Sequence, residues 1–225
     1  MAEPVQIGIL LYPNVTQLDA TGPAQVLSRV PGAKMHMIWK TLDPVPTDAG
    51  FSIVPTTTFA DCPQLDVICV PGGGGQVELM VDPETLDFLR KQAATARYVT
   101  SVCTGSLVLG AAGLLKGYKS ACHWAWRDML KDFGAIPVAE RVVRDRNRIS
   151  GGGVTAGIDF GLTVVAELVG RTQAEAIQLG LEYAPAPPFD AGTPESAPAD
   201  VVDAVRSRMA GTRQAREVIL DRISG

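Results

Sequence analysis

The chain has 225 residues, of which 46% are hydrophobic and 20% are charged, and its formal net charge is −4 at pH 7. This length suits one large α/β domain with a buried core. The negative charge disfavours binding to nucleic acid or to an anionic membrane surface, and no apolar run reaches the roughly 20 residues that a membrane span requires.

Short apolar runs alternate along the chain with helical patterns. Strands are expected at residues 5–11, 34–41, 51–54, 66–70 and 98–102, and a hairpin-like pair at 141–145 and 148–150. Helices are expected at residues 21–30, 83–96, 125–133, 155–169, 172–183 and from about 200 onward, with Thr172 and Glu175 as a capping box. This alternation predicts a single-domain α/β fold: a mostly parallel, flavodoxin-like sheet with helices on both faces.

The domain boundaries follow from the same pattern. Residues 1–200 are expected to form the catalytic domain. The helix at 201–225 has an apolar stripe, so it is expected either to complete that domain or to contact a second copy of the chain. The first residues lack the positively charged region of a signal peptide, which predicts a cytoplasmic protein. Only two histidines and no C-x-x-C pattern occur, so no metal site is expected.

Cys103 lies in the most informative segment of the chain. An apolar run with β-branched residues ends at the cysteine, and a helix-forming stretch starts directly after it. This predicts a nucleophile elbow, a sharp strand-to-helix turn with the thiol at its tip. The helix N-terminus is expected to lower the pKa of the thiol below the free value of about 8.5, giving a reactive thiolate. The alternative is a buried structural cysteine, which is how Cys62, Cys69 and Cys122 are interpreted.

Three features are expected at the carboxyl ends of the strands, where parallel sheets bind their ligands. They are Asp19 after the first strand, the glycine run at residues 72–75, and Cys103. Asp19 either caps the following helix or exchanges a proton with the thiol. Backbone N–H groups of Gly72 and Gly73, with that of Thr104, would stabilise developing negative charge, unless the glycine run is only a flexible turn.

Two other residues are candidates with alternatives. Thr104 is either an ordinary residue of the first helical turn or a hydroxyl donor to the thiolate or substrate. His123 is a conceivable base, although a histidine in this setting is more often structural.

The segments 19–23, 71–73 and 102–105 together resemble the ThiJ/PfpI superfamily, which shares its fold with class I glutamine amidotransferases. Residues 100–115 and 181–189, with Asp19, are similar to the bacterial isocyanide hydratases. Two departures from other members matter. Thr104 stands where peptidase-like members carry histidine, and Asp19 stands where many redox-sensing and deglycase-like members carry glutamate.

The resemblance implies hydration of an isocyanide to an N-substituted formamide through a covalent thioimidate on Cys103. Asp19 would be the general acid, and Thr104 and Gly73 would position the intermediate. It further implies a homodimer that needs neither a metal nor an organic cofactor. The alternatives are a glyoxalase- or deglycase-like enzyme acting on aldehydes, an AraC-type regulatory domain, and a redox sensor. For the regulatory domain, the expected helix-turn-helix region is missing.

Overall fold

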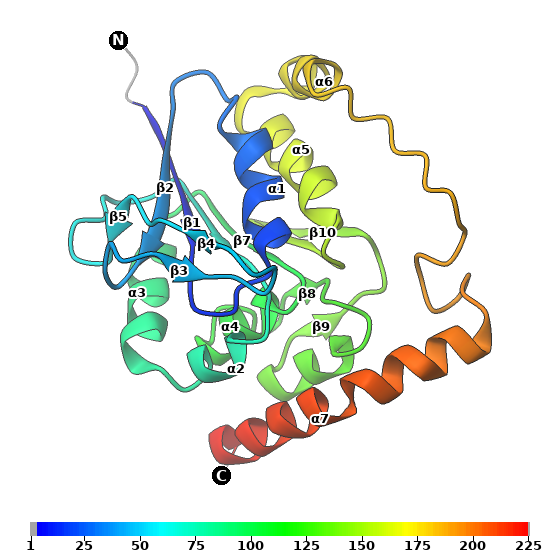
Figure 1. Cartoon of the computed structure of the whole chain (residues 1–225). Coiled ribbons are helices and arrows are strands. Elements are labelled where there is room, and N and C mark those ends of the chain that lie inside the picture. Colours follow the sequence, from blue (N-terminus) through cyan, green and yellow to red (C-terminus); the bar gives the residue numbers. More distant parts are fainter. Residues whose placement is uncertain (1–3, 225) are drawn as a thin grey trace.

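The computed structural model describes residues 4–224, and its centre is a seven-stranded sheet between two layers of helices (Figure 1). All neighbouring strands pair in parallel except the edge strand β10, which is antiparallel to β11. The predicted mostly parallel α/β sheet is thereby confirmed. In spatial order the strands are β10 (Val142–Asp145), β11 (Arg148–Gly151), β7 (Tyr98–Val102), β6 (Val67–Val70), β1 (Val5–Leu10), β2 (Ala33–Trp39) and β5 (Thr57–Thr58).

Two small ribbons lie outside this sheet. One pairs β3 (Val45–Pro46) with β4 (Ser52–Ile53), and the other pairs β8 (Lys119–Ser120) with β9 (Ile136–Pro137). Only β4 was expected from the sequence. Two-residue strands carry too little periodicity to be recognised from their residues alone.

Helices cover both faces of the sheet, and each layer has its own apolar core. One face carries α1 (Gln17–Leu27), α5 (Ala156–Val169) and α6 (Arg171–Gly180). The opposite face carries α2 (Gln76–Leu79), α3 (Pro83–Ala93), α4 (Gly105–Ala111), the 3-10 helix η1 (Arg127–Phe133) and α7 (Ala199–Ser224). The strands between the two layers are buried on both sides, which explains why they read as continuous apolar runs.

The helices differ from the sequence-based expectation in several places, and the short helix α2 was not expected. The first begins at Gln17 rather than Thr21, and the segment after Trp126 is a 3-10 helix rather than an α-helix. The prediction of a capping box formed by Thr172 and Glu175 is wrong. Gly170, with φ 96°, ends α5 and directly starts α6, so Thr172 already lies inside the helix and makes no capping hydrogen bond.

Helix α7 returns to the body of the molecule after an extended, proline-rich segment (Figure 1). Val202 and Leu220 of this helix are buried, whereas Val201 is exposed, so only part of the predicted apolar stripe is covered by the same chain. None of the helices in residues 4–224 is both long and apolar enough to cross a membrane. Residues 1–3, on which the expectation of no signal peptide partly rests, lie outside the described residues.

Candidate active site

Cys103 lies at the tip of a strand-to-helix turn between β7 and α4, as predicted. Its φ of 56° is one of four positive values among the described non-glycine residues. The left-handed region is strained for a cysteine and is a known feature of functional turns. The backbone N–H of Cys103 donates to Gly151 at the end of β11 at 3.0 Å, which fixes the turn to the sheet. Cys103 as a whole residue is only 5% exposed.

Two glycines permit the close backbone contacts around the elbow. A Cβ atom on Gly105 would lie 1.9 Å from the carbonyl oxygen of Val70, at the end of the neighbouring strand. A Cβ on Gly72 would lie 2.7 Å from the backbone nitrogen of Thr104 and 2.8 Å from Oδ2 of Asp19. No side chain fits in either place, so the loop after β6 is pressed directly against the elbow.

Asp19 is part of this cluster and does not cap its helix. It is the third residue of α1, whose N-cap position is Thr16. The carboxyl group is completely buried, and Oδ2 accepts the backbone N–H of Gly72 at 2.9 Å. Oδ1 is buried without an aligned hydrogen-bond partner. The structure therefore leaves one carboxylate oxygen available in the interior beside the thiol.

The Cys103 thiol and the Asp19 carboxyl group each change the pKa of the other. Burial raises the pKa of Asp19 to about 7, against the opposing effects of the Gly72 N–H and of the adjacent Cys103 thiol. Burial and the Asp19 carboxylate raise the pKa of the Cys103 thiol, although the N–H of Thr104 lowers it. The predicted drop of the thiol pKa is therefore wrong: the helix N-terminus is outweighed by desolvation and by the adjacent carboxylate.

Thr104 links the elbow to the glycine loop. Its Oγ1 accepts the backbone N–H of Gly73 at 3.1 Å. In this geometry the N–H groups of Gly72 and Gly73 are thus engaged by the side chains of Asp19 and Thr104. For either N–H to reach a substrate, the corresponding bond would have to open.

The other cysteines and His123 differ from Cys103 in their surroundings. Burial raises the pKa of Cys62 to about 11 and of Cys69 to about 12, which fits their interpretation as packing residues. Cys122 is buried near the elbow, and its pKa is raised to about 11. Burial and nearby Arg216 lower the pKa of His123 to about 4, so this imidazole is neutral at neutral pH.

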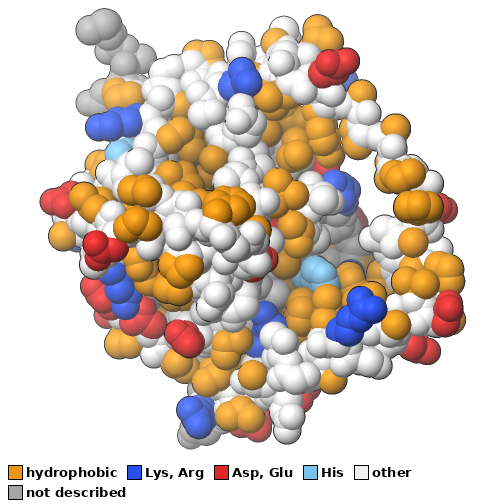
Figure 2. Space-filling model, in the orientation of Figure 1, with side chains coloured by type: hydrophobic (Ala, Val, Ile, Leu, Met, Phe, Trp, Pro, Cys, Tyr) orange, Lys and Arg blue, Asp and Glu red, His pale blue; other side chains and the backbone are white. Residues whose placement is uncertain are grey.

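A hollow of about 340 Å³ lies next to Gly152, one residue after the glycine that accepts the Cys103 N–H, but Cys103 itself does not line it. It lies between the residues after β11 and the extended segment that precedes α7, and Figure 2 shows this face of the molecule. Its lining includes Cys122, His123, Trp124, Gly152, Val154 and Thr193. Within residues 4–224 no group of three or more His, Cys, Asp or Glu side chains could hold a metal ion.

Arg216 is a buried charged residue that sequence reasoning missed. It lies on α7, is 2% exposed, and its guanidinium lies over the ring of Trp126 at 4.2 Å. A signal was present in the sequence, because Val202, Met209 and Arg216 follow one another at intervals of seven residues. A charged residue on the buried stripe of a helix requires a partner inside the protein.

Comparisons with known proteins agree with this geometry. The DJ-1/PfpI family model matches residues 5–167. An isonitrile hydratase of Pseudomonas putida is 60% identical over 218 residues, which are 97% of this chain and 96% of that protein. The crystal structure of a ThiJ/PfpI family protein from Pseudomonas syringae has a TM-score of 0.93 at 52% identity, covering 97% of this chain and 91% of that one.

A transcriptional regulator shares a smaller part of its length with this chain. The HTH-type regulator GbdR of Pseudomonas aeruginosa is 32% identical over 183 residues, which are 77% of this chain and 49% of the regulator. The predicted ThiJ/PfpI resemblance is confirmed by the family model and by the Pseudomonas syringae structure. The chain belongs to the DJ-1/PfpI family.

Proposed function

We propose that this chain hydrates isocyanides to N-substituted formamides, with Cys103 as the nucleophile. Isonitrile is a synonym of isocyanide, and the similarity to an isonitrile hydratase extends over 97% of the chain. The observation that carries the proposal is the buried pair of Asp19 and Cys103. A carboxyl group with a pKa of about 7 beside a thiol can both accept and return a proton at neutral pH.

The first half of the reaction adds the thiol across the terminal carbon of R–N≡C. As the sulfur of Cys103 forms a bond to this carbon, the thiol proton passes to the carboxylate of Asp19. Asp19 then delivers a proton to the same carbon, which gives the thioimidate R–N=CH–S–Cys103. Because both pKa values are raised, the resting thiol keeps its proton until attack begins.

The second half adds water to the thioimidate carbon. Asp19 accepts a proton from the attacking water and returns it to the nitrogen, which gives R–NH–CH(OH)–S–Cys103. Collapse of this intermediate breaks the C–S bond, releases R–NH–CHO and returns a proton to the sulfur. The steps are proton transfers and the making and breaking of bonds at the isocyanide carbon, with no net oxidation or reduction. Neither a metal nor an organic cofactor is therefore required.

The other site residues have supporting roles in this proposal. Thr104 gives its N–H to the sulfur and keeps the loop of Gly73 against the elbow through its hydroxyl. Gly72 orients the carboxyl of Asp19 through a hydrogen bond of 2.9 Å. We further propose that the N–H groups of Gly72 and Gly73 turn to the intermediate when negative charge develops there.

The shape of the substrate supports the proposal. Cys103 is 5% exposed, so bulky groups cannot reach its sulfur without movement of the surrounding chain. An isocyanide ends in a narrow, linear N≡C unit with the electrophilic carbon at its tip. Such a group needs less space at the sulfur than a branched electrophile does, so it suits a thiol that is almost completely buried.

We also propose a cytoplasmic homodimer. All four cysteines are free in the structure, which fits a reducing compartment. Leu18, Ile158 and Leu181 line a shallow apolar depression on α1, α5 and the end of α6, and a second copy of the chain would cover it. Light scattering on the purified protein measures the mass directly, and a monomer at micromolar concentration would contradict the dimer.

The test of the proposed reaction is formamide production from p-nitrophenyl isocyanide by wild type and by Cys103→Ala. We expect turnover by the wild type and none by the variant, with an intermediate of the substrate mass plus the protein mass visible by rapid-quench mass spectrometry. Cys62→Ala is the matched control, because it removes a partly buried cysteine that contacts Gln92 of α3 rather than the elbow residues. Turnover of methylglyoxal without turnover of the isocyanide would replace this proposal by an aldehyde-directed activity.

A further inference from the structure

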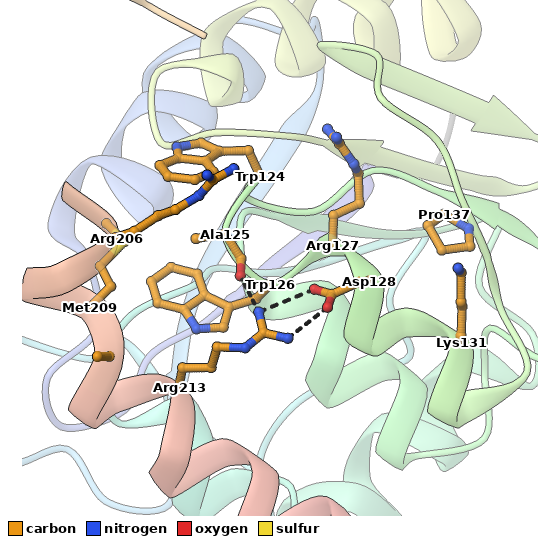
Figure 3. A pocket seen from close by; sticks show the side chains of 11 residues that line it. Trp124, Ala125, Trp126, Arg127, Asp128, Lys131, Pro137, Arg206, Met209 and Arg213 are labelled. Carbon is orange, nitrogen blue, oxygen red and sulfur yellow. Dashed lines mark hydrogen bonds and ion pairs between the residues drawn. The ribbon is translucent and has the colours of Figure 1, made fainter. Parts of the chain in front are cut away.

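A cavity of about 690 Å³ lies between helix α7 and the segment that contains η1 (Figure 3). Figure 3 shows Arg206 and Met209 of α7 on one side of this cavity, and Arg127 and Lys131 of η1 on the other. Its volume is in the range of cavities that bind small organic molecules. The cavity is therefore large enough to be a binding site of its own.

This cavity is separate from the thiol site. Cys103, Asp19 and Gly72 are not among the described residues that line it. Of the described residues, it shares only Trp124 and Arg127 with the hollow next to Gly152. A ligand bound between α7 and η1 would therefore not occupy the place where the thiol reacts.

Positive side chains dominate the lining of the cavity. Four cationic groups and one carboxylate give a local balance of +3, whereas the whole chain has a formal net charge of −4. The cations are Arg127, Lys131, Arg206 and Arg213, and the carboxylate is that of Asp128. A positively charged hollow on a negatively charged protein raises the concentration of small anions at this one place.

The carboxylate in the lining is already paired. Oδ2 of Asp128 accepts from Nη2 of Arg213 at 2.6 Å, and Nη1 of the same arginine donates to the carbonyl of Ala125 at 2.8 Å. These bonds attach α7 to the segment before η1 and neutralise the charge of Asp128 (Figure 3). Arg213 and Asp128 therefore form part of the wall and neither attract nor repel an anion strongly.

The other three cations are available to a ligand. Among residues 4–224, no carboxylate lies within 4.0 Å of the charged nitrogens of Arg127 or Lys131. Arg206 has Asp203 at 3.9 Å, a contact between two exposed side chains on α7. Such a long surface pair contributes little and is easily exchanged for a better partner. The cavity therefore presents three positive charges without a strong counterion.

The remaining walls are aromatic and apolar. The ring of Trp124 stacks on His123 with 5.7 Å between the ring centres, and the ring of Trp126 lies 4.8 Å from the same imidazole. The guanidinium carbon of Arg206 lies 5.7 Å from the centre of the Trp124 ring, and Met209 lines the cavity beside it. These contacts hold the rings in place, so the apolar walls are formed before a ligand binds.

We propose that this cavity binds a small organic anion with an aromatic ring, of the aryl carboxylate class. The carboxylate would be attracted by Arg127, Lys131 and Arg206, and the ring would contact Trp124 and Met209. An inorganic anion would leave the apolar walls unused, and a neutral aromatic molecule would leave the cations without a counterion. The inference goes beyond the proposed function, because no step of isocyanide hydration requires this cavity.

The test compares three ligands by isothermal titration calorimetry on the wild-type protein. They are 2-naphthoate, which has both features, 2-naphthamide, which lacks the charge, and inorganic sulfate, which lacks the ring. We expect 2-naphthoate to bind, and the other two to bind more weakly by roughly tenfold or more. Higher salt should weaken the binding of 2-naphthoate, since the cations are open to solvent.

Variants then locate the bound ligand. Lys131→Gln combined with Arg206→Gln removes two exposed cations from opposite sides of the cavity, and we expect binding of 2-naphthoate to weaken by roughly tenfold. Arg208→Gln is the matched control, because it removes an exposed arginine of α7 that does not line the cavity. Circular dichroism checks that each variant is folded. If the double variant does not fold, Arg206→Gln alone replaces it, with an expected loss of roughly threefold.

Each outcome supports or overturns the inference. Wild-type affinity in the folded double variant would overturn it, and so would an equal loss in Arg208→Gln, since general surface charge would then explain the binding. Equal affinities for 2-naphthoate and 2-naphthamide, or for 2-naphthoate and sulfate, would contradict the proposed ligand class, as would the absence of binding by all three. None of these measurements uses isocyanide turnover, so failure here leaves the proposed function standing.

Discussion

Gly72 donates its backbone N–H to Oδ2 of Asp19 at 2.9 Å, and the same glycine leaves no space for a side chain. This contact joins the loop after β6 to helix α1, directly beside the elbow of Cys103. The hydrogen bond and the steric fit therefore depend on one residue, and a change at Gly72 tests the assembly of the whole cluster.

Gly72→Ala is expected to displace the glycine loop from the elbow. The added Cβ would lie 2.7 Å from the backbone nitrogen of Thr104, and a backbone atom cannot move aside as a flexible side chain can. We expect a loss of about 1–3 kcal/mol in the free energy of unfolding, together with lower activity. Gly74→Ala is the control, because its Cβ would meet only Asn14 at 3.9 Å. Urea denaturation of both variants gives the comparison, and equal stabilities would contradict the steric argument.

Asp19→Asn should slow isocyanide hydration by about 10²–10⁴-fold, because the amide can still accept the Gly72 N–H but cannot carry a proton. The wild-type value of kcat/KM should rise as pH increases through about 7, where the Asp19 carboxyl ionises. The variant should lack this rise. A pH–rate series on both proteins measures it, and an unchanged rise in Asp19→Asn would assign the titration to another group.

The same carboxyl makes the stability of the protein depend on pH. Its pKa is raised from 3.8 to about 7 on folding, so between these values the folded state binds more protons than the unfolded state. The stabilising effect is complete below about pH 4 and is lost as pH rises to about 7. The stability of wild type relative to Asp19→Asn should thus fall over this range, by at most about 4 kcal/mol. Denaturation at several pH values measures this difference, and a constant difference would exclude the raised pKa.

Thr104→Val tests the hydroxyl that holds the glycine loop. The valine has the same shape but leaves the buried N–H of Gly73 without an acceptor, which costs about 1–3 kcal/mol. Thr104→Ser keeps the oxygen and should stay close to the wild type in stability and in turnover. Thermal denaturation and the formamide assay compare the two. Equal behaviour of the valine and serine variants would show that the hydroxyl is dispensable.

Much of the fold could be predicted because its signals are local. The apolar runs of β1 and β6, the alternation with helices, and the break at Cys103 each depend on neighbouring residues. The family resemblance rested on short segments of the same kind. The least predictable elements were the two-residue strands and the 3-10 helix η1, whose form depends on the chain packed around them rather than on their own periodicity.

Sequence by itself determined the class of fold, the elbow and the set of Asp19, Cys103, Thr104 and the glycine loop. Only the tertiary structure decided how burial and neighbouring charges change the pKa values of these groups. Burial reversed the expected direction of the Cys103 pKa, because desolvation and the Asp19 charge act through space and leave no trace in the local pattern. Packing also buried Arg216, from the far end of the chain, against Trp126, since a helix can be placed against the body of the protein only once both are folded.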